Sequence, residues 1–137
     1  MRGFELNVLT PTGVGFSGEV QELYLRTTSG EIGILAGHTD YLAGVVPCAV
    51  YLTDGEGIGR SAFCGGGFLS IVSGSVTMTV DEFTPADTLD ADAVKAEYDA
   101  ISAELVACNE QKEPERAQYL KDRLARVSAK IKAIEEK

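Results

Sequence analysis

The sequence predicts a mainly β protein with added α structure, in which an N-terminal β-sandwich of about eight to ten short strands precedes an antiparallel two-helix hairpin. Two observations support this division. Apolar and polar residues alternate through the first 84 residues, with turn signals roughly every 8 to 12 residues. From Asp87 onward glycine is absent, and apolar residues recur at the spacing of amphipathic helices.

The chain is long enough for one domain with an appendage, because 137 residues with 45% hydrophobic content can bury a core. We place the sandwich at residues 1–84, a linker at residues 85–90 and a helical hairpin at residues 91–137. The character of the sequence changes at Pro85, because glycine is absent and alanine is frequent from Asp87 onward.

The expected strands are short and are separated by glycine, proline or aspartate. The first covers residues 4–9 and ends at Thr10-Pro11-Thr12-Gly13, a sequence suited to a turn. The later strands are expected at residues 14–17, 20–27, 45–52, 58–64, 68–72 and 75–84. Such a series is typical of a sandwich or barrel.

The stretch from Ser29 to Leu42 is the centre of this half. Its three glycines divide the apolar residues too closely for a helix, which favours short strands and tight turns. It also contains His38, the single histidine of the chain. His38 is interpreted either as a turn residue with a satisfied hydrogen bond or as part of a rigid edge that presents His38, Asp40 and Tyr41 to a partner.

Two helices are expected in the second half, each with apolar residues on one face. These are Val94, Tyr98, Ile101, Leu105 and Cys108 in the first helix, and Leu120, Leu124, Val127, Ile131 and Ile134 in the second. Asp90 or Asp87 suits the N-cap of the first helix, and Pro114 suits the first turn of the second. Two matching apolar stripes joined by a short loop predict a hairpin.

The two expected helices carry opposite charge. Seven acidic residues accompany only Lys95 between Asp87 and Glu110, whereas six basic residues accompany only Asp122 between Arg116 and Lys132. The basic residues are Arg116, Lys121, Arg123, Arg126, Lys130 and Lys132. The opposite charges can pair within the hairpin, at about 0 to 1 kcal/mol for each exposed pair. Alternatively, the basic helix can dock in an acidic groove elsewhere.

Composition and charge argue against several classes of protein. A formal net charge of -9 disfavours nucleic-acid binding. The three cysteines are widely spaced, and we interpret them as small buried hydrophobes in a reducing compartment rather than a disulfide framework or a zinc site. No run approaches the roughly 18 apolar residues that cross a bilayer, and Glu5 interrupts the apolar segment that a signal peptide needs. We expect a cytosolic chain without direct membrane insertion.

The sequence lacks the motifs of common enzymes, which disfavours catalysis. Gly65-Gly66-Gly67 is followed by Phe68 with no nearby lysine, unlike a phosphate-binding loop. No serine lies in a G-x-S-x-G elbow, and a single histidine disfavours a metal site. Asp81 and Glu82 are adjacent in an expected strand, so we predict that their side chains point to opposite faces and do not act as a pair.

Three motifs, taken in order, resemble the epsilon subunit of rotary F-type ATP synthases of the bacterial type, whose mitochondrial equivalent is called delta. They are Thr10-Pro11-x-Gly13, Gly30-Glu31-x-Gly33-x-Leu35-x-Gly37-His38 and Gly66-Gly67-Phe68. The order of sandwich, acidic linker and two helices is also similar, so the resemblance covers nearly the whole chain. Thr39-Asp40-Tyr41-Leu42 departs from the more usual alanine- and proline-rich continuation.

The resemblance implies a non-catalytic central-stalk subunit. Its sandwich would bind the gamma subunit and rest on the c-ring, so that ion flow through the membrane sector drives ATP synthesis from ADP and phosphate. Glu31 matches the position that faces the c-ring. The positions implied for the gamma contact are His38, Thr39, Asp40, Tyr41 and Leu42. The implied location is peripheral, on the cytoplasmic face of a bacterial cell membrane.

The resemblance also implies a regulatory role for the hairpin. In similar subunits the hairpin either folds against the sandwich or extends along gamma among the alpha and beta catalytic subunits, where it blocks ATP hydrolysis. The basic residues of the second helix suit contact with acidic loops of those subunits.

Some similar subunits bind ATP through a motif of the form [IL]-D-x-x-R-A. Leu89-Asp90-Ala91-Asp92 matches its start, but Ala93 stands in place of the arginine, and Lys95 lies about 200° further around the helix. Asp90, Arg123 and Arg126 are candidate contacts for ATP as a regulatory ligand. No other cofactor and no metal is expected.

Without the resemblance, a second class of function stays open, namely a free-standing ligand-binding module such as an ATP sensor. A stalk subunit predicts co-purification with a membrane-associated ATPase, whereas a free module predicts a monomer with a small-molecule pocket. A native pull-down separates the two.

Overall fold

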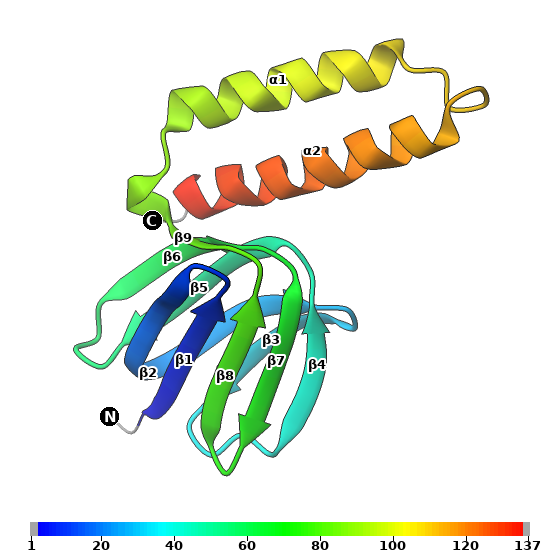
Figure 1. Cartoon of the computed structure of the whole chain (residues 1–137). Helices are drawn as coiled ribbons and strands as arrows, with labels where there is room; N and C mark the ends of the chain where they lie inside the picture. Colours follow the sequence, from blue (N-terminus) through cyan, green and yellow to red (C-terminus); the bar gives the residue numbers. More distant parts are fainter. Residues whose placement is uncertain (1–2, 136–137) are drawn as a thin grey trace.

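The computed structural model describes residues 3–135, which form a β-sandwich with a two-helix hairpin lying across one end (Figure 1). The strands are β1 (Phe4–Thr10), β2 (Gly13–Thr27), β3 (Gly30–Leu35), β4 (Tyr41–Val45), β5 (Cys48–Asp54), β6 (Gly59–Cys64), β7 (Gly67–Val72), β8 (Ser75–Val80) and β9 (Phe83–Pro85). A 3-10 turn, η1 (Ala86–Thr88), leads to the helices α1 (Ala91–Ala107) and α2 (Pro114–Glu135). The predicted fold class is confirmed.

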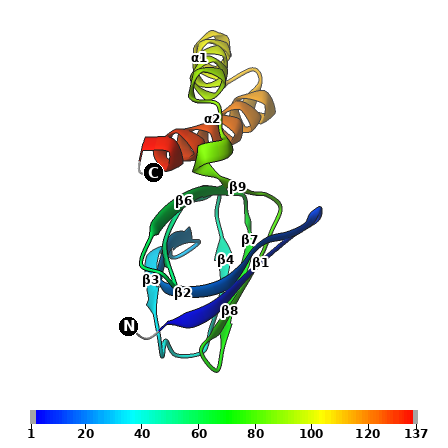
Figure 2. The same cartoon turned by 90° about the vertical axis from the view of Figure 1, so that its left-hand side faces the viewer.

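One sheet folds back on itself to make the two layers of the sandwich (Figure 2). Its hydrogen-bonded order is β1-β8-β7-β4-β2-β5-β6-β9, and β3 pairs with β2. β1 also pairs with β2, which closes the sheet. The first half of β2 pairs with β1 and the second half with β3 and β5, and a register shift between Val20 and Glu22 separates the two halves. β2 therefore belongs to both layers.

The sandwich core consists of apolar side chains from both layers. Its buried members are Phe4, Leu6, Val8, Val20, Leu23, Leu25, Ile34, Val45, Cys48, Val50, Leu52, Cys64, Leu69, Ile71, Val76, Met78 and Val80. Along β1 and β8 they alternate with more exposed positions, as the period of a half-buried strand requires. The apolar residues of the alternating pattern that predicted these strands are thus the residues that form the core.

Three strand boundaries differ from the prediction. β2 is one strand where two were expected, because Gly18 stays in the ladder opposite Leu6. The expected strand at residues 45–52 is interrupted at Val46-Pro47, where the chain leaves β7 as partner of β4 and meets β6 as partner of β5. The strand expected at residues 75–84 is interrupted at Asp81 and Glu82. In each case the choice of partner strand decides the boundary.

The glycine-rich centre forms β3, a turn and the start of β4, as the spacing predicts. Gly30 and Gly37 have φ angles of +117° and +82°, which a residue with a side chain rarely adopts. These two glycines begin β3 and end the turn after it, so they fix the ends of this strand.

Candidate functional site

The hairpin has a hydrophobic core of its own. Val94 and Ile101 of α1 pack with Leu120 and Val127 of α2, all four of which are buried. Half-buried side chains complete this core, namely Tyr98, Leu105, Cys108, Leu124, Ile131 and Ile134. Asp90 is the N-cap of α1, since its Oδ1 accepts hydrogen bonds from Asp92 N at 3.0 Å and Ala93 N at 3.2 Å. The predicted apolar stripes therefore face each other rather than the sandwich.

Only α2 lies against the sandwich, while α1 lies on its far side (Figures 1 and 2). The contact is made near the end of α2 by small side chains, where Ala133 packs with Ala49 of β5 and Ala86 of η1. Ser61 Oγ donates a buried hydrogen bond of 2.8 Å to the carbonyl oxygen of Ala133. This bond gives a sandwich partner to a carbonyl in the last described turn of α2, where helix carbonyls often lack partners within the helix. We call this contact, together with the ion pairs described next, the dock.

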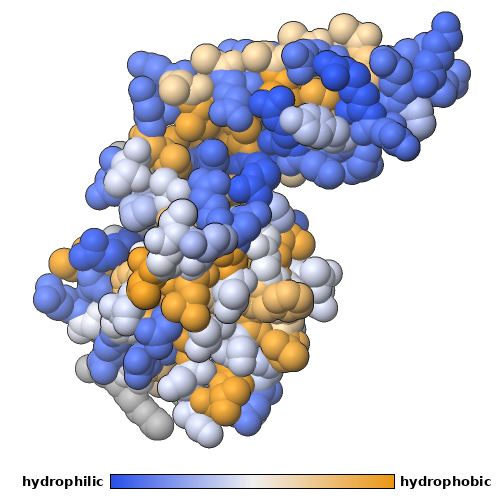
Figure 3. All heavy atoms as spheres, viewed as in Figure 1, coloured by the Kyte–Doolittle hydropathy of each residue, from blue (hydrophilic) through white to orange (hydrophobic). Residues whose placement is uncertain are grey.

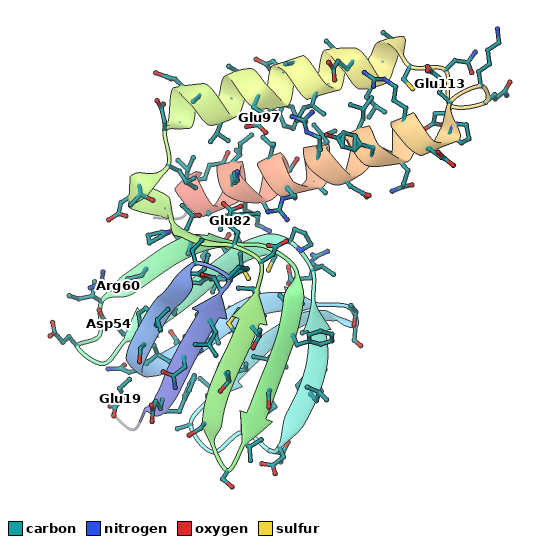
Figure 4. The ribbon with its side chains drawn as sticks, in the orientation of Figure 1. Glu19, Asp54, Arg60, Glu82, Glu97 and Glu113 are labelled. Atoms are coloured by element: carbon teal, nitrogen blue, oxygen red, sulfur yellow. The ribbon has the colours of Figure 1, made fainter. Side chains whose placement is uncertain are left out.

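The polar part of the dock joins Arg126 to two adjacent carboxylates. Arg126 Nη1 lies 3.3 Å from Asp81 Oδ2, and Nη2 lies 3.0 Å from Glu82 Oε1. Lys130 Nζ lies 4.0 Å from Glu82 Oε2. Figure 4 shows Glu82 between the sandwich and α2. The prediction that Asp81 and Glu82 cannot act together is wrong, because they lie in a bend between β8 and β9 and not within a strand.

The glycine triplet makes this bend. Gly65 N donates to Glu82 O at 2.8 Å, and Asp81 N donates to Gly66 O at 3.0 Å. A Cβ atom at Gly65 would lie 1.6 Å from Asp81 Oδ1, too close for any real contact. A side chain at Gly65 would therefore displace the Asp81 carboxylate from its present position beside Arg126, and this role of the triplet differs from the phosphate-binding loop considered for it.

Phe63 lies beneath the same charges. Its ring is fully buried, and both Arg126 Cζ and Lys130 Nζ lie 5.2 Å from its centroid. Cations over an aromatic face contribute about 0.5 to 1 kcal/mol at partly exposed sites. Sequence reasoning did not identify Ser61 or Phe63 as dock residues, because neither has a motif, and the contact that defines them comes from α2.

The basic residues of α2 divide between three kinds of environment. Arg126 and Lys130 pair with the sandwich. Within the hairpin region, Lys121 pairs with Glu110, and Arg123 Nη2 lies 3.8 Å from Glu97 Oε1 of α1 (Figure 4). No ion pair of Arg116 or Lys132 is found among residues 3–135. Charge pairing between the two helices is thus present but slight.

The three candidate ATP contacts already have protein partners. Asp90 caps α1 with its Oδ1, Arg123 pairs with Glu97, and Arg126 pairs with the acidic bend. No contact joins Asp90 to either arginine within the described part of the chain. Binding of ATP by these residues stays a prediction.

The residues proposed as a partner edge lie at the two ends of β3. At one end, His38 Nδ1 hydrogen-bonds the carbonyl oxygen of Thr39 at 2.8 Å, and its ring meets that of Tyr41 edge to face with centroids 6.0 Å apart. Asp40 Oδ1 accepts a 2.9 Å hydrogen bond from Ser73 N. Leu42 is 73% exposed. His38 therefore has the satisfied hydrogen bond of a turn residue and also belongs to an ordered edge.

Glu31 lies at the other end of β3, apart from His38. It pairs with Arg26 across the β2–β3 ladder, with Arg26 Nη2 and Glu31 Oε1 3.2 Å apart. Both side chains are more than half exposed. The structure thus separates the predicted residues into two exposed surfaces, a Glu31 end that faces α2 and a His38 end that faces away from it.

Residues 3–135 contain neither a metal site nor a membrane-spanning helix. No group of three or more His, Cys, Asp or Glu side chains is placed to hold a metal ion. No helix in the same range is long and apolar enough to cross a membrane.

The fold and the dock define a sandwich-and-hairpin protein whose hairpin has its own core. The family model for the β-sandwich domain of the ATP synthase delta/epsilon chain matches residues 3–86. The chain belongs to this family and is an epsilon-type subunit of F-type ATP synthase, as the sequence motifs predicted.

Individual relatives agree with this assignment. The chain is 31% identical over 123 residues to the ATP synthase epsilon chain of Cutibacterium acnes, covering 86% of this chain and 82% of that one. It is 35% identical over 105 residues to the epsilon chain of Ruminococcus albus, covering 76% of each. In fold it resembles a chain of the Euglena gracilis mitochondrial ATP synthase, with a TM-score of 0.81, 19% identity, and coverage of 93% of this chain and 78% of that one.

Proposed function

We propose that this epsilon-type chain works as a non-catalytic part of the central stalk. Its sandwich binds the gamma subunit and the c-ring, and it transmits the rotation that ion flow produces to the synthesis of ATP from ADP and phosphate. The chain acts at the cytoplasmic face of a bacterial cell membrane, as a peripheral subunit. Two structures similar in fold come from mitochondrial ATP synthases, one of them described as central stalk and c-ring, which supports the proposal.

An exposed apolar surface on β4 and β7 supports contact with gamma. Leu42, Phe68 and Val72 are 73%, 64% and 59% exposed. Leu42 pairs with Ser70 and Phe68 with Gly44, so these side chains lie on one face of neighbouring strands. Figure 3 shows apolar residues spread over the sandwich, whereas the hairpin in this view is mostly hydrophilic apart from its upper edge and the seam between its helices. Apolar side chains grouped in this way mark an interaction surface.

The Arg26–Glu31 pair supports a separate contact with the c-ring. It lies at the β2–β3 turn, at the opposite end of β3 from His38. An exposed ion pair contributes little to folding, so its charges are available to polar loops of another subunit. Two partners at two ends of one strand fit a subunit placed between gamma and the c-ring.

The single observation that supports a regulatory role is the independence of the hairpin. Its core includes no sandwich residue, and the dock consists of alanine contacts, one buried hydrogen bond and partly exposed ion pairs. The folded hairpin therefore detaches without exposing either main core. Once α2 leaves the dock, Arg126 and Lys130 join Arg116 and Lys132 in offering positive charge to acidic loops of the alpha and beta subunits.

Removal of all residues after Asp87 tests this function. In the reconstituted complex we expect the shortened chain to assemble with gamma and the c-ring and ATP hydrolysis to increase, because the inhibitory helix is absent. Co-purification measures assembly, and a steady-state hydrolysis assay measures inhibition. Unchanged hydrolysis in a fully assembled complex would exclude the inhibitory role, and loss of assembly would show that the sandwich alone does not bind its partners.

A further inference from the structure

Two of the three cysteines lie directly opposite each other on neighbouring strands. Cys48 begins β5, Cys64 ends β6, and their Cα atoms are partners in the antiparallel register. Opposed residues of such a pair project to the same face, with Cα atoms about 4.5 to 5.5 Å apart. That separation is within the range that a disulfide bridges. Both thiols are free and buried in the sandwich core.

The two thiols differ in access. Cys48 lines a cavity of about 510 Å³ between α2 and the strands β2, β3 and β5, and the cavity is open to solvent. Cys64 does not line this cavity, is fully buried and donates its thiol hydrogen to the carbonyl oxygen of Gly65 at 3.0 Å. A small oxidant that enters the cavity therefore reaches Cys48 first.

The charges around the pair also differ. Arg26, Lys132 and Glu31 line the same cavity as Cys48, and Glu31 is paired with Arg26. The cations outnumber the carboxylate there, and cationic side chains favour the thiolate form of cysteine. The neighbouring Cys64 thiol lowers the pKa of Cys48, against the opposing effect of burial. Proximity to Cys48, burial and the nearby Asp81 carboxylate raise the pKa of Cys64. Together with its access to the cavity, this makes Cys48 the nucleophilic thiol of the pair.

We propose that Cys48 and Cys64 form a peroxide-sensitive thiol pair, in which Cys48 is the reacting and Cys64 the resolving cysteine. The Cys48 thiolate attacks one oxygen of hydrogen peroxide, the O–O bond breaks, and Cys48 sulfenic acid and hydroxide form. The Cys64 sulfur then attacks the Cys48 sulfur and displaces hydroxide, which takes the Cys64 proton and leaves as water. The sulfurs lose two electrons in total, and peroxide is reduced to one water and one hydroxide, which takes up the proton that Cys48 released when its thiolate formed. A dithiol reductant reverses the reaction.

Tryptic mapping of the full chain after peroxide treatment tests the proposal directly. Cleavage after Arg26, Arg60, Lys95 and Lys112 places each cysteine in its own peptide, Cys48 in residues 27–60, Cys64 in residues 61–95 and Cys108 in residues 96–112. We expect peptides 27–60 and 61–95 to be joined, with the loss of two hydrogen atoms, and to separate again after dithiothreitol. Peptides 27–60 and 61–95 recovered with free thiols, while 96–112 is oxidised, would overturn the proposal.

Two variants separate the roles of the two thiols. In Cys64→Ser the sulfenic acid has no resolving partner, so dimedone is expected to label peptide 27–60. In Cys48→Ser we expect Cys64 to stay reduced, because it has no access to the cavity. Cys108→Ser is the matched control and should form the bridge as the natural chain does. Dimedone on peptide 61–95 of Cys48→Ser, at the rate found for Cys48, would refute the assignment of roles.

Discussion

Replacement of Arg126 by glutamine tests how the hairpin is held on the sandwich. The guanidinium bridges Asp81 and Glu82 at 3.3 and 3.0 Å and covers the ring of Phe63. Glutamine removes the charge and keeps a good helix former. We expect the hairpin to leave the dock more often in Arg126→Gln, while the sandwich and the hairpin each stay folded on their own cores.

The expected magnitude follows from the exposure of the dock. The side chains of Arg126, Asp81 and Glu82 are 31%, 57% and 37% exposed, so solvent screens both ion pairs. We assign about 0.5 to 1 kcal/mol to each pair, and a similar amount to the contact with Phe63. The total of about 1.5 to 3 kcal/mol corresponds to a roughly 10- to 150-fold increase in the detached population.

Spin-label distances measure this population. Val72 on the sandwich and Val106 on the hairpin are exposed, so both accept labels in a background whose cysteines are replaced by alanine. Double electron–electron resonance should give one distance range in this background and a second, longer range in Arg126→Gln. Circular dichroism should show unchanged helix content, because α1 and α2 still pack on each other.

Arg116→Gln is the matched control, since Arg116 is an exposed arginine of α2 for which no ion pair is found within residues 3–135. A double-mutant cycle with Glu82→Gln isolates the energy of the Arg126–Glu82 pair. The same distance distribution in Arg126→Gln and Arg116→Gln would refute the view that these ion pairs hold the dock.

Two further predictions concern the sandwich. Gly67→Ala should lower the free energy of unfolding, measured by urea titration, by about 1 to 3 kcal/mol, because the new Cβ would lie 2.0 Å from the carbonyl oxygen of Thr79. Gly59→Ala is the control, since no atom lies within 4 Å of its Cβ. Equal stability of the two variants would contradict the close approach of β7 and β8. A backbone hydrogen bond from Ile58 and the side chain of Arg60 lower the pKa of Asp54 (Figure 4). The ionised Asp54 therefore stabilises the fold at pH values above the usual carboxyl pKa. This stabilisation is lost as the pH falls through the lowered pKa. Asp54→Asn should therefore be less stable than the natural chain at neutral pH and equal to it in strong acid. A stability difference between Asp54→Asn and the natural chain that persists in strong acid would contradict this account. Glu56→Gln is the control and should be as stable as the natural chain at neutral pH.

Local patterns in the sequence are sufficient to predict most strands and both helices and to identify the family. Alternation in the first half and the four-three spacing in the second depend only on which residues of a strand or helix share a face, a property of neighbouring positions. They predict the β-sandwich and both apolar stripes of the hairpin. The sequence offered Asp90 or Asp87 as the cap of the first helix, and the structure uses Asp90. The glycine motifs mark backbone positions where a side chain does not fit, and their order identifies the family.

Partners distant in the chain decide what local patterns leave open. The length of β2, the interruption at Pro47 and the bend at Asp81 follow from which strands pair, and pairing brings together residues far apart in sequence. The dock is the clearest case, because Ser61 meets Ala133 and Arg126 meets Glu82 only after two separately formed cores come together. The sequence by itself therefore determined the parts and the family of this protein, whereas the tertiary structure alone decided how the hairpin is held, since that hold depends on contacts without a local signature.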